Sequence, residues 1–347
     1  MAKQAYVYSG TEWVPLASEV TNLSAYQTKA LNQFPNRNLI INGAMQVAQR
    51  GTSASSLTTT GYRTADRWQF QITTQGTWTM SVENDAPTGS GFRKSTKVLC
   101  TTADASPAAG DVVLLSQTIE GQNLQRIKKG TAAAEQLTVS FWVKSNVTGT
   151  YIFEIYDADN TRAISKSYTI SASGVWEYKT ITIPADTTGA FDNDNDASVF
   201  IQWFLGAGSN LTSGTLNSSS WTSPTTANRV VGQTNLASAT NNYWQITGVQ
   251  LEVGDTATPF EFKNVTQELQ ECYRYYYKHL GVNIHAGSYS SGVWIGNAQN
   301  IVPMRVAPTV TITSGNGTVG LAGIHSWYFT GAAASSFVGE YTANSEL

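Results

Sequence analysis

The stretch YWQITGVQLEVGDTATPFEF, at residues 243–262, sets the fold class of the region that it closes. Its apolar residues keep one parity of a two-residue period up to Ile246 and take the opposite parity from Val249 onward. Because successive side chains of a strand point to opposite faces of a sheet, this slip of one residue predicts a β-bulge near Gly248. The stretch therefore predicts a long, bent strand that is buried in a sheet.

The same two-residue alternation recurs outward from this stretch, across residues 38–262. In residues 137–144, Leu, Val, Phe and Val alternate with Thr, Ser, Trp and Lys. The segment NLIINGAMQVAQRG, at residues 38–51, predicts the first strand of the unit. Further strands are expected at residues 113–119, 151–156, 176–183 and 199–205. Eight or more strands without helical periods between them indicate an all-β, antiparallel sandwich.

Residues 206–242 interrupt the pattern with a segment rich in Ser, Thr, Asn and Gly. A connection of this length is too long for an ordinary hairpin and is typical of a functional or loosely ordered loop. Trp221 is the expected anchor that keeps this loop on the surface of the sandwich.

Beyond residue 262 the pattern predicts a short helix and then a small second β-module. Asn264 followed by Gln267 resembles a capping box, and apolar residues at helical spacing predict a helix over residues 265–276. We expect the run from Arg274 to Tyr277 to pack the helix end between the two β-units, although it also fits an exposed aromatic patch. Short β-runs follow at 293–295, 301–304 and 310–312, before a Gly/Ala-rich tail.

Residues 1–36 are expected to form a docking segment. A small hairpin is predicted over residues 5–16, with its turn at Ser9–Gly10. Two such strands are marginal alone, so we expect them to fold against another subunit or another protein. Residues 19–34 hold two weak heptads, which fit either a linker with a short helix or a short trimeric neck. The predicted domains are therefore 1–36, 37–262 and 263–347.

Composition argues against several classes of partner. Charged residues make up 13% of the 347 residues, the net charge is −3, and the strongest basic cluster is Arg126, Lys128 and Lys129. We therefore expect no nucleic-acid partner. The sequence shows neither a run of about 18 apolar residues nor a signal-peptide core, so we expect no membrane insertion. The spacing of Cys100 and Cys272 supports neither a disulfide framework nor a zinc site.

Five segments resemble, in the same order, the sandwich domain of tail fibres and related appendages of tailed bacteriophages. They are NLIINGAMQVAQRG at 38–51, TGYRTADRW at 60–68, LTVSFWVKSN at 137–146, SASGVWEYKTITIPADTTG at 171–189 and the closing stretch at 243–262. QECYRYYYK at 270–278 and VPMRVAPTVTIT at 302–313 resemble the usual sequel, and AYVYSGTEWVPL resembles the short repeats with which such proteins begin. The resemblance implies a jelly-roll β-sandwich like that of carbohydrate-binding modules, between a short N-terminal docking segment and a small C-terminal β-module.

The resemblance also implies a function. We expect a phage virion protein of tail-fibre type, made in the host cytoplasm without a signal peptide, that attaches to the host cell surface by binding a glycan. Residues 1–36 would contact another virion protein, and a homotrimer is expected by analogy with phage fibres. Two alternatives are an architectural head decoration or tail connector without receptor binding, and a polysaccharide depolymerase.

Aromatic side chains are the candidate carbohydrate-binding residues, because their rings stack on sugar faces while polar neighbours bond the hydroxyls. The candidates are Trp142, Trp176, Tyr178 and Trp221. Trp142 lies on the polar parity of its strand and is expected to be displayed, whereas Trp203 lies on the apolar parity and is expected in the core. Burial or a subunit contact is the competing interpretation for each ring. Specificity is expected in the loop 206–242, in the exposed aromatics or in the module beyond Asn264.

Asp192, Asp194 and Asp196 alternate within AFDNDNDAS, a spacing that can gather oxygen ligands around a structural calcium ion. The segment is not an EF-hand, because Ala197 and Trp203 occupy the positions that need Gly and Glu. A solvated acidic turn is the competing interpretation. No cofactor is expected to be required.

Catalysis is not expected. Glu154, Asp157 and Glu177 lie in the predicted sandwich, but the sequence cannot pair two of them across a cleft, as glycoside hydrolysis requires. The histidines lack a triad-like context, and no nucleophile-elbow, P-loop or dinucleotide motif is present. The repeat pattern of a parallel β-helix is also absent from the sequence.

Overall fold

The computed structural model describes residues 36–347, except 286–287, 291–292, 316 and 333–335, together with two short strands near the N-terminus. These strands, β1 (Tyr6–Tyr8) and β2 (Trp13–Pro15), pair antiparallel, which confirms the predicted hairpin. Its turn and the linker or neck over residues 19–34 lie outside the described residues. Among the described helices, none is long and apolar enough to cross a membrane.

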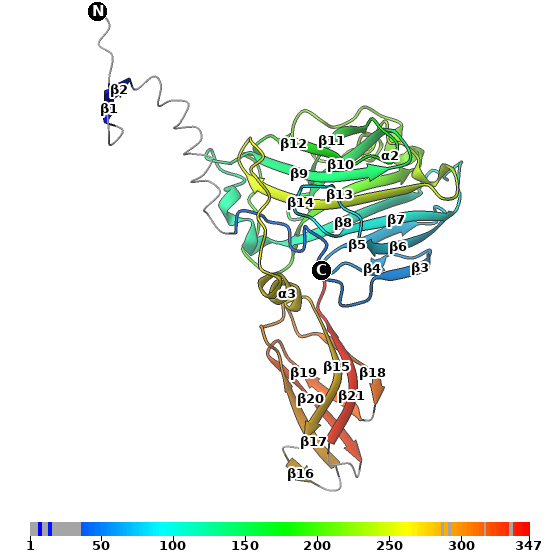
Figure 1. The fold of residues 1–347 in the computed structure, drawn as a ribbon, viewed down its shortest axis with the longest axis vertical. Coiled ribbons are helices and arrows are strands. Elements are labelled where there is room, and N and C mark those ends of the chain that lie inside the picture. Colours follow the sequence, from blue (N-terminus) through cyan, green and yellow to red (C-terminus); the bar gives the residue numbers. More distant parts are fainter. Residues whose placement is uncertain are drawn as a thin grey trace, which may run out of the picture.

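Two six-stranded antiparallel sheets form the sandwich (Figure 1). The first sheet has the order β11-β10-β13-β8-β5-β4 and the second has the order β12-β9-β14-β7-β6-β3. The strands of the first sheet are β4 (Gly61–Tyr62), β5 (Gln69–Thr73), β8 (Val112–Glu120), β10 (Gly149–Asp157), β11 (Arg162–Ile170) and β13 (Ala197–Ala207). Those of the second sheet are β3 (Ser53–Leu57), β6 (Thr77–Glu83), β7 (Ser95–Thr102), β9 (Leu137–Ser145), β12 (Glu177–Ile183) and β14 (Tyr243–Val253). From β7 to β14 the chain crosses between the sheets at every connection except β10 to β11, so the fold is the predicted jelly roll.

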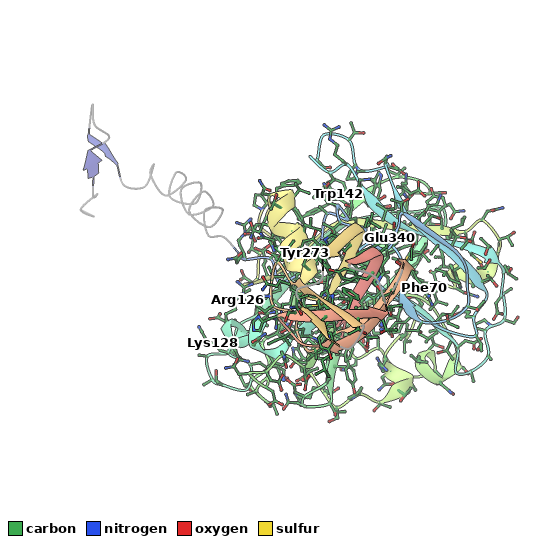
Figure 2. The ribbon with its side chains drawn as sticks, turned by 90° about the horizontal axis from the view of Figure 1, so that it is seen from below. Phe70, Arg126, Lys128, Trp142, Tyr273 and Glu340 are labelled. Carbon is green, nitrogen blue, oxygen red and sulfur yellow. The ribbon has the colours of Figure 1, made fainter. Side chains whose placement is uncertain are left out.

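The core lies between the sheets because alternate residues of each strand point inward. Phe141 and Val143 of β9 face Ile201 and Trp203 of β13, and all four are fully buried. The ring centroids of Phe141 and Trp203 lie 5.7 Å apart, which joins the two sheets directly. Trp203 is therefore a core residue, as predicted. Figure 2 shows the side chains of the molecule from the side of the C-terminal module, with Phe70 of β5 and Trp142 of β9 labelled.

The predicted bulge in β14 is confirmed. The register between β14 and β9 shifts between Thr247 and Gln250, and Gly248 has a left-handed φ of 62°. The backbone N–H of Val249 donates to the carbonyl of Gly43 (3.0 Å) and not to a strand neighbour. The bulge thus fastens the opening segment of the sandwich to its closing strand.

That opening segment, residues 38–51, is a turn and not the strand that we predicted. Asn42 and Met45 both have a φ of 57°, which a strand cannot accommodate. The Asn42 side chain donates to the carbonyls of Val47 and Asp66 and accepts from the Val47 N–H, so it takes over the role of ladder hydrogen bonds. The segment still lies beside β14, since the Leu39 N–H donates to the Leu251 carbonyl (2.8 Å).

The loop over residues 206–242 packs down onto the outer face of the first sheet. It contains a helical turn, α2 (Ser209–Thr212), and two 3-10 turns, η3 (Thr226–Asn228) and η4 (Leu236–Ser238). Val230 contacts a small apolar cluster formed by Leu114, Ile152 and Phe204. Trp221 anchors the loop as predicted, because its ring is buried and its indole N–H donates to the Pro184 carbonyl (2.8 Å).

Helix α3 (Val265–Tyr273) follows the sandwich and ends three residues earlier than predicted, because β15 (Tyr276–His285) begins at Tyr276. The Asn264 side chain caps it by accepting the Thr266 N–H (2.8 Å). The C-terminal module then forms two small sheets, with the orders β15-β21-β18 and β16-β17-β20-β19. Their other strands are β16 (Ser288–Ser290), β17 (Val293–Gln299), β18 (Thr309–Gly315), β19 (Thr318–Ala322), β20 (Ser326–Ala332) and β21 (Ser336–Asn344).

One predicted β-run of this module is wrong. Residues 301–304 form no strand, because Met304 is buried and its N–H bonds to the Ile324 carbonyl across a loop. The Gly/Ala-rich tail is part of the module, because β20 and the centrally placed β21 come from it. Trp327, Phe329 and Tyr341 from these two strands form much of the core of the module.

The RYYY run joins the module to the sandwich, as predicted. Arg274 forms two hydrogen bonds to the Glu120 carboxylate (2.8 and 2.7 Å). The Tyr275 ring lies 3.5 Å from the Arg67 guanidinium carbon, and the Tyr276 ring lies 3.5 Å from that of Arg50. Figure 1 shows the module projecting from one side of the sandwich, with the start of β15 and the end of β21 both at the junction.

Candidate functional site

A hollow on the outer face of the first sheet is the candidate binding site. Since the core takes the odd-numbered residues of β10 and β13, the even-numbered residues of these strands face outward. A hollow of about 260 Å³ lies over them, and we call it the sheet groove. The residues that line it are Gln71, Tyr156, Phe200, Gln202 and Arg229. Arg229 comes from the loop over residues 206–242, which therefore forms one wall.

The aromatic surface of the sheet groove comes from Tyr156 and Phe200, which are cross-strand partners in β10 and β13. Their ring centroids are 6.2 Å apart, and both side chains are half-buried. The Arg229 guanidinium carbon lies 5.3 Å from the Tyr156 ring centroid, so a cation–π contact holds this ring in place. The pair offers apolar surface without filling the hollow.

The polar side of the sheet groove is built on a buried charge pair. The Glu154 carboxylate is fully buried and accepts hydrogen bonds from Arg229 Nε (3.0 Å) and Ser165 Oγ (3.1 Å). Burial lowers the pKa of Arg229, but the hydrogen bonds and negative charge of Glu154 outweigh this and leave the pKa above its ordinary value. The guanidinium is therefore charged, and its charge is offset locally. Gln71 is oriented by donating to Gln69 Oε1 (2.7 Å) and Ser116 Oγ (2.9 Å).

Three of the four predicted aromatic residues lie together on the outer face of the second sheet. Trp142 and Tyr178 are cross-strand partners, and their ring centroids are 5.3 Å apart. Trp176 precedes Tyr178 by two residues, and its indole N–H donates to Asp85 Oδ1 (3.2 Å). We call these three rings the aromatic platform. Trp142 is half-buried by these neighbours and less displayed than predicted.

The fourth candidate, Trp221, does not belong to a binding surface. Its side chain is only 7% exposed and lies in the core cluster of the sandwich. The Lys129 ammonium lies 5.7 Å from its ring centroid and the indole N–H is bonded to Pro184, so the ring offers no face to a sugar. Trp221 is an anchor residue only.

The acidic segment at residues 192–196 does not gather its carboxylates. Asp194 accepts the Asp196 N–H (3.0 Å), while Asp196 lies 3.4 Å from Arg305. Asn195 also exchanges hydrogen bonds with the Arg305 carbonyl and guanidinium (2.6 and 2.9 Å). No group of three or more His, Cys, Asp or Glu side chains in the described chain is placed to hold a metal ion. A structural calcium ion at Asp192, Asp194 and Asp196 stays a prediction, and the segment contacts the C-terminal module through Asn195 and Asp196.

The three candidate carboxylates each have partners of their own. Glu154 is paired with Arg229 beneath the sheet groove, and Asp157 is buried beside the Lys129 ammonium (2.6 Å). Glu177 lies in the other sheet. It accepts a hydrogen bond from the Ser171 N–H (2.8 Å) and forms an ion pair with Lys179 of the same strand.

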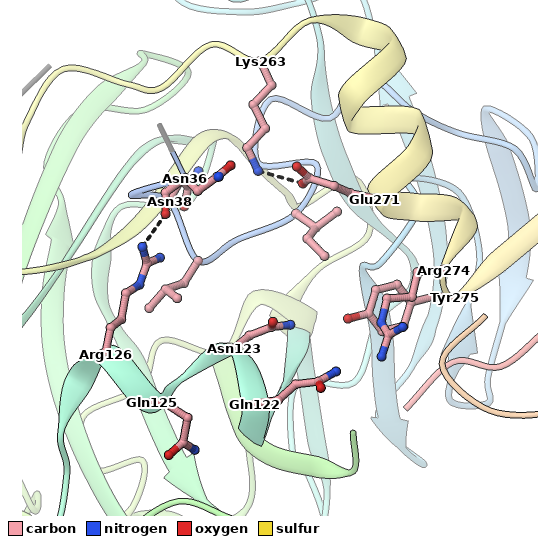
Figure 3. A pocket seen from close by; sticks show the side chains of 12 residues that line it. Asn36, Asn38, Gln122, Asn123, Gln125, Arg126, Lys263, Glu271, Arg274 and Tyr275 are labelled. Carbon is pink, nitrogen blue, oxygen red and sulfur yellow. Dashed lines mark hydrogen bonds and ion pairs between the residues drawn. The ribbon is translucent and has the colours of Figure 1, made fainter. Parts of the chain in front are cut away.

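A larger hollow, of about 690 Å³, lies where the sandwich meets α3 (Figure 3). Its wall includes the turns η1 (Gly121–Asn123) and η2 (Gln125–Ile127). Its charged side chains already have partners, because Lys263 pairs with Glu271 (2.7 Å) and Arg126 donates to the Asn36 carbonyl. Tyr275 is buried and presents no ring face. We therefore place the candidate site at the sheet groove.

Sequence reasoning missed Tyr156, Phe200, Gln202 and Arg229. The sequence does mark Tyr156 and Phe200, because each is an aromatic residue on the outward-facing parity of its strand, as Trp142 is. Their pairing depends on the register between β10 and β13, and the approach of Arg229 depends on how the long loop folds back. Neither can be read from the sequence pattern.

Comparisons with protein-family models and with curated proteins found no match. Among solved structures, 50 chains match. One is the enzymatically active domain of tailspike protein 4 of bacteriophage CBA120, with a TM-score of 0.35, 16% identity and coverage of 63% of this chain and 22% of that chain. Another is TmCBM61 in complex with β-1,4-galactotriose (TM-score 0.32, 11% identity, 63% and 99% coverage). A third is the family 11 carbohydrate-binding module of Clostridium thermocellum in complex with a β-1,3-1,4-mixed-linked tetrasaccharide (TM-score 0.29, 10% identity, 59% and 95% coverage).

Proposed function

We propose that this chain is a tail-fibre-type virion protein that attaches a tailed phage to its host by binding a surface glycan. The observation that carries the binding function is the sheet groove, where aromatic rings, amides and a guanidinium surround one hollow. The phage setting is supported by the ordered sequence motifs between residues 38 and 262.

The chemistry of the sheet groove suits a pyranose ring. Such a ring has faces of C–H bonds, which pack on aromatic rings, and a rim of hydroxyls, which both donate and accept hydrogen bonds. Tyr156 and Phe200 supply the apolar surface, while Gln71 and Gln202 supply amides that can donate and accept. Because Glu154 offsets the charge of Arg229, the groove favours an uncharged sugar over an anion.

The proposed mode of action is binding without hydrolysis. Glu154 accepts a hydrogen bond from Arg229 of the groove wall, and its carboxylate is fully buried. A general acid must reach the glycosidic oxygen, and a second carboxylate must lie on the other side of the bond. We therefore expect no release of reducing sugar from any polysaccharide that the protein binds.

The binding proposal can be tested on an array of capsular polysaccharides and O-antigens from a panel of bacterial strains. Removing one stacking ring from a binding hollow costs roughly tenfold or more in affinity, so Tyr156→Ala should weaken binding to that extent. Tyr156→Phe keeps the ring and should bind as the wild type does. Leu321→Ala, at an apolar residue of the C-terminal module that is 78% exposed, is the control. If the wild type binds a polysaccharide and Tyr156→Ala binds it with the same affinity, the sheet groove is not the binding site.

The virion role has its own tests. Residues 1–36 are proposed to dock onto another virion protein, and a homotrimer would add avidity to weak individual contacts. Mass photometry should give a trimer, and a stable monomer at micromolar concentration would contradict this.

Labelling of the protein in intact virions should mark the distal tail. Label on the capsid would instead support the architectural alternative. Deletion of residues 1–36 should abolish incorporation into particles.

A further inference from the structure

We infer that the aromatic platform is a second glycan-binding surface, so that one sandwich binds two glycan chains on opposite faces. This inference rests on the proposed glycan-binding function. It concerns Trp142, Trp176 and Tyr178 of the second sheet, whereas the sheet groove belongs to the first.

The platform is held in place from its margins. Asp85 accepts hydrogen bonds from the Trp176 indole (3.2 Å) and the Gln245 amide (3.3 Å), and it forms an ion pair with Lys144. The Lys144 ammonium lies 5.2 Å from the Trp176 ring centroid. Burial raises the pKa of Asp85, but the hydrogen bonds from Lys144 and Trp176 outweigh this and leave the pKa below its ordinary value. The Trp176 ring is therefore held by a hydrogen-bonded frame, in which the charges of Asp85 and Lys144 offset each other, before any ligand arrives.

The exposed part of the platform fits a sugar ring. Tyr178 is 46% exposed and lies against the half-buried Trp142, so the two rings present one apolar surface. Lys144 and Asp85 lie at its edge and can bond the hydroxyls of a sugar stacked on the rings, whereas the buried Gln245 helps to hold Asp85 in place. Since Asp85 and Lys144 offset each other, an uncharged pyranose matches the surface better than an acidic sugar.

A second copy of this chain is a poorer occupant. A stable protein interface buries about 800 Å² on each partner, with apolar side chains at its centre. Of the eight large hydrophobic side chains that are exposed in the described chain, only Tyr178 and the adjacent Val175 lie here. The other six lie at or beyond Phe262. The platform therefore offers the aromatic surface on which a sugar ring stacks, but it lacks the apolar centre of a subunit interface.

The two surfaces cannot serve a single ligand site. The core of the sandwich lies between the sheets, and packed sheets are about 10 Å apart before the outward side chains are added. A short oligosaccharide in the sheet groove therefore cannot reach Tyr178. One protein molecule would instead bridge two glycan chains of the host surface.

The test is calorimetric titration with oligosaccharides of four to six sugars, cut from the bacterial polysaccharides of the array. Full-length wild type should bind two equivalents per chain. Tyr178→Ala and Tyr156→Ala should each lose one equivalent, with binding at the affected surface weakened about tenfold or more. Tyr178→Phe, which keeps the ring, and the control Leu321→Ala should keep both equivalents. Circular dichroism would verify that each variant is folded.

The outcomes separate the two proposals. If the wild type binds only one equivalent and Tyr178→Ala still binds it, the inference about the platform is wrong and the proposal for the sheet groove stands. If the wild type binds only one equivalent, and Tyr178→Ala loses it while Tyr156→Ala does not, the two-site inference is wrong. The binding function then belongs to the platform. No heat with any oligosaccharide overturns both proposals together.

Discussion

Gly248 permits the bulge in β14 for two separable reasons. Its φ is 62°, and a Cβ at this position would lie 2.5 Å from Phe92 Cζ. Left-handed backbone costs an alanine about 1–2 kcal/mol, and overpacking adds about 1–3 kcal/mol. Gly89 has a φ of 77° with no heavy atom within 4 Å of the same position, so Gly89→Ala carries the backbone cost alone. Urea denaturation should show Gly248→Ala to be the more destabilising; equal losses would contradict the packing argument.

Asp66 makes stability depend on pH in an unusual direction. Burial raises its pKa to about 6, although Arg50 and two hydrogen bonds from Gln49 lower it. The folded chain therefore holds a proton between about pH 4 and pH 6 that the unfolded chain releases, so this stabilisation is complete at low pH and lost as pH rises through 6.

Asp66→Asn removes this titration. Relative to the wild type, the free energy of unfolding of the variant should rise by about 1–3 kcal/mol between pH 4 and pH 7. Urea denaturation at several pH values measures the difference, which cancels the contributions of the other carboxylates. A difference that falls as pH rises would contradict the assignment.

At the scale of elements, Trp221 holds the long loop that carries Arg229 into the sheet groove. Truncating a buried Trp to Ala costs about 3–5 kcal/mol, and here part of the loss should appear as local opening of residues 206–242. Trp221→Ala should therefore be cleaved faster within this loop by limited proteolysis. Trp221→Phe keeps the packing, loses the hydrogen bond to Pro184 and should be cleaved at a rate closer to that of the wild type. An unchanged cleavage rate in Trp221→Ala would show that the loop is held elsewhere.

The strands were predictable from the sequence where one face is buried, and the turns were not. LTVSFWVKS alternates strictly, so β9 could be placed nearly to the residue. Residues 38–51 are just as apolar, but the Asn42 side chain bonds replace a strand ladder, and residue spacing does not reveal them. The same limit applies to the candidate site. Parity marks Tyr156 and Phe200 as outward, but only the register between β10 and β13 makes them neighbours.

For the whole molecule, the junction between sandwich and C-terminal module is fastened by both ends of the module. Arg274 and Tyr275 attach its beginning to Glu120 and Arg67. Glu346, beyond the last strand, forms ion pairs with Arg67 and Arg50. A unit tied by one strand could swing freely, whereas two ties with buried charges hold the module as an extension of the sandwich. Force on the sandwich can therefore pass to the module without a hinge between them.

Arg67 is the residue on which this coupling most depends. It is 1% exposed, donates to the Thr118 carbonyl (2.6 Å), pairs with Glu346 and lies against the Tyr275 ring. Removing one partner of a buried ion pair costs about 3–5 kcal/mol, because the other charge remains buried. Differential scanning calorimetry of the wild type should give one cooperative transition for sandwich and module together. Arg67→Met should separate it into two, with the module melting first.

Arg63→Met is the matched control, because Arg63 bonds only to the neighbouring Thr59 and Thr60 among the described contacts, and none of these bonds is with the C-terminal module. It should keep the single transition of the wild type. A single, unshifted transition in Arg67→Met would mean that the other ties, from Arg274 and from Arg50 to Glu346, suffice to couple the two units. Two transitions already present in the wild type would show that the junction does not couple them at all.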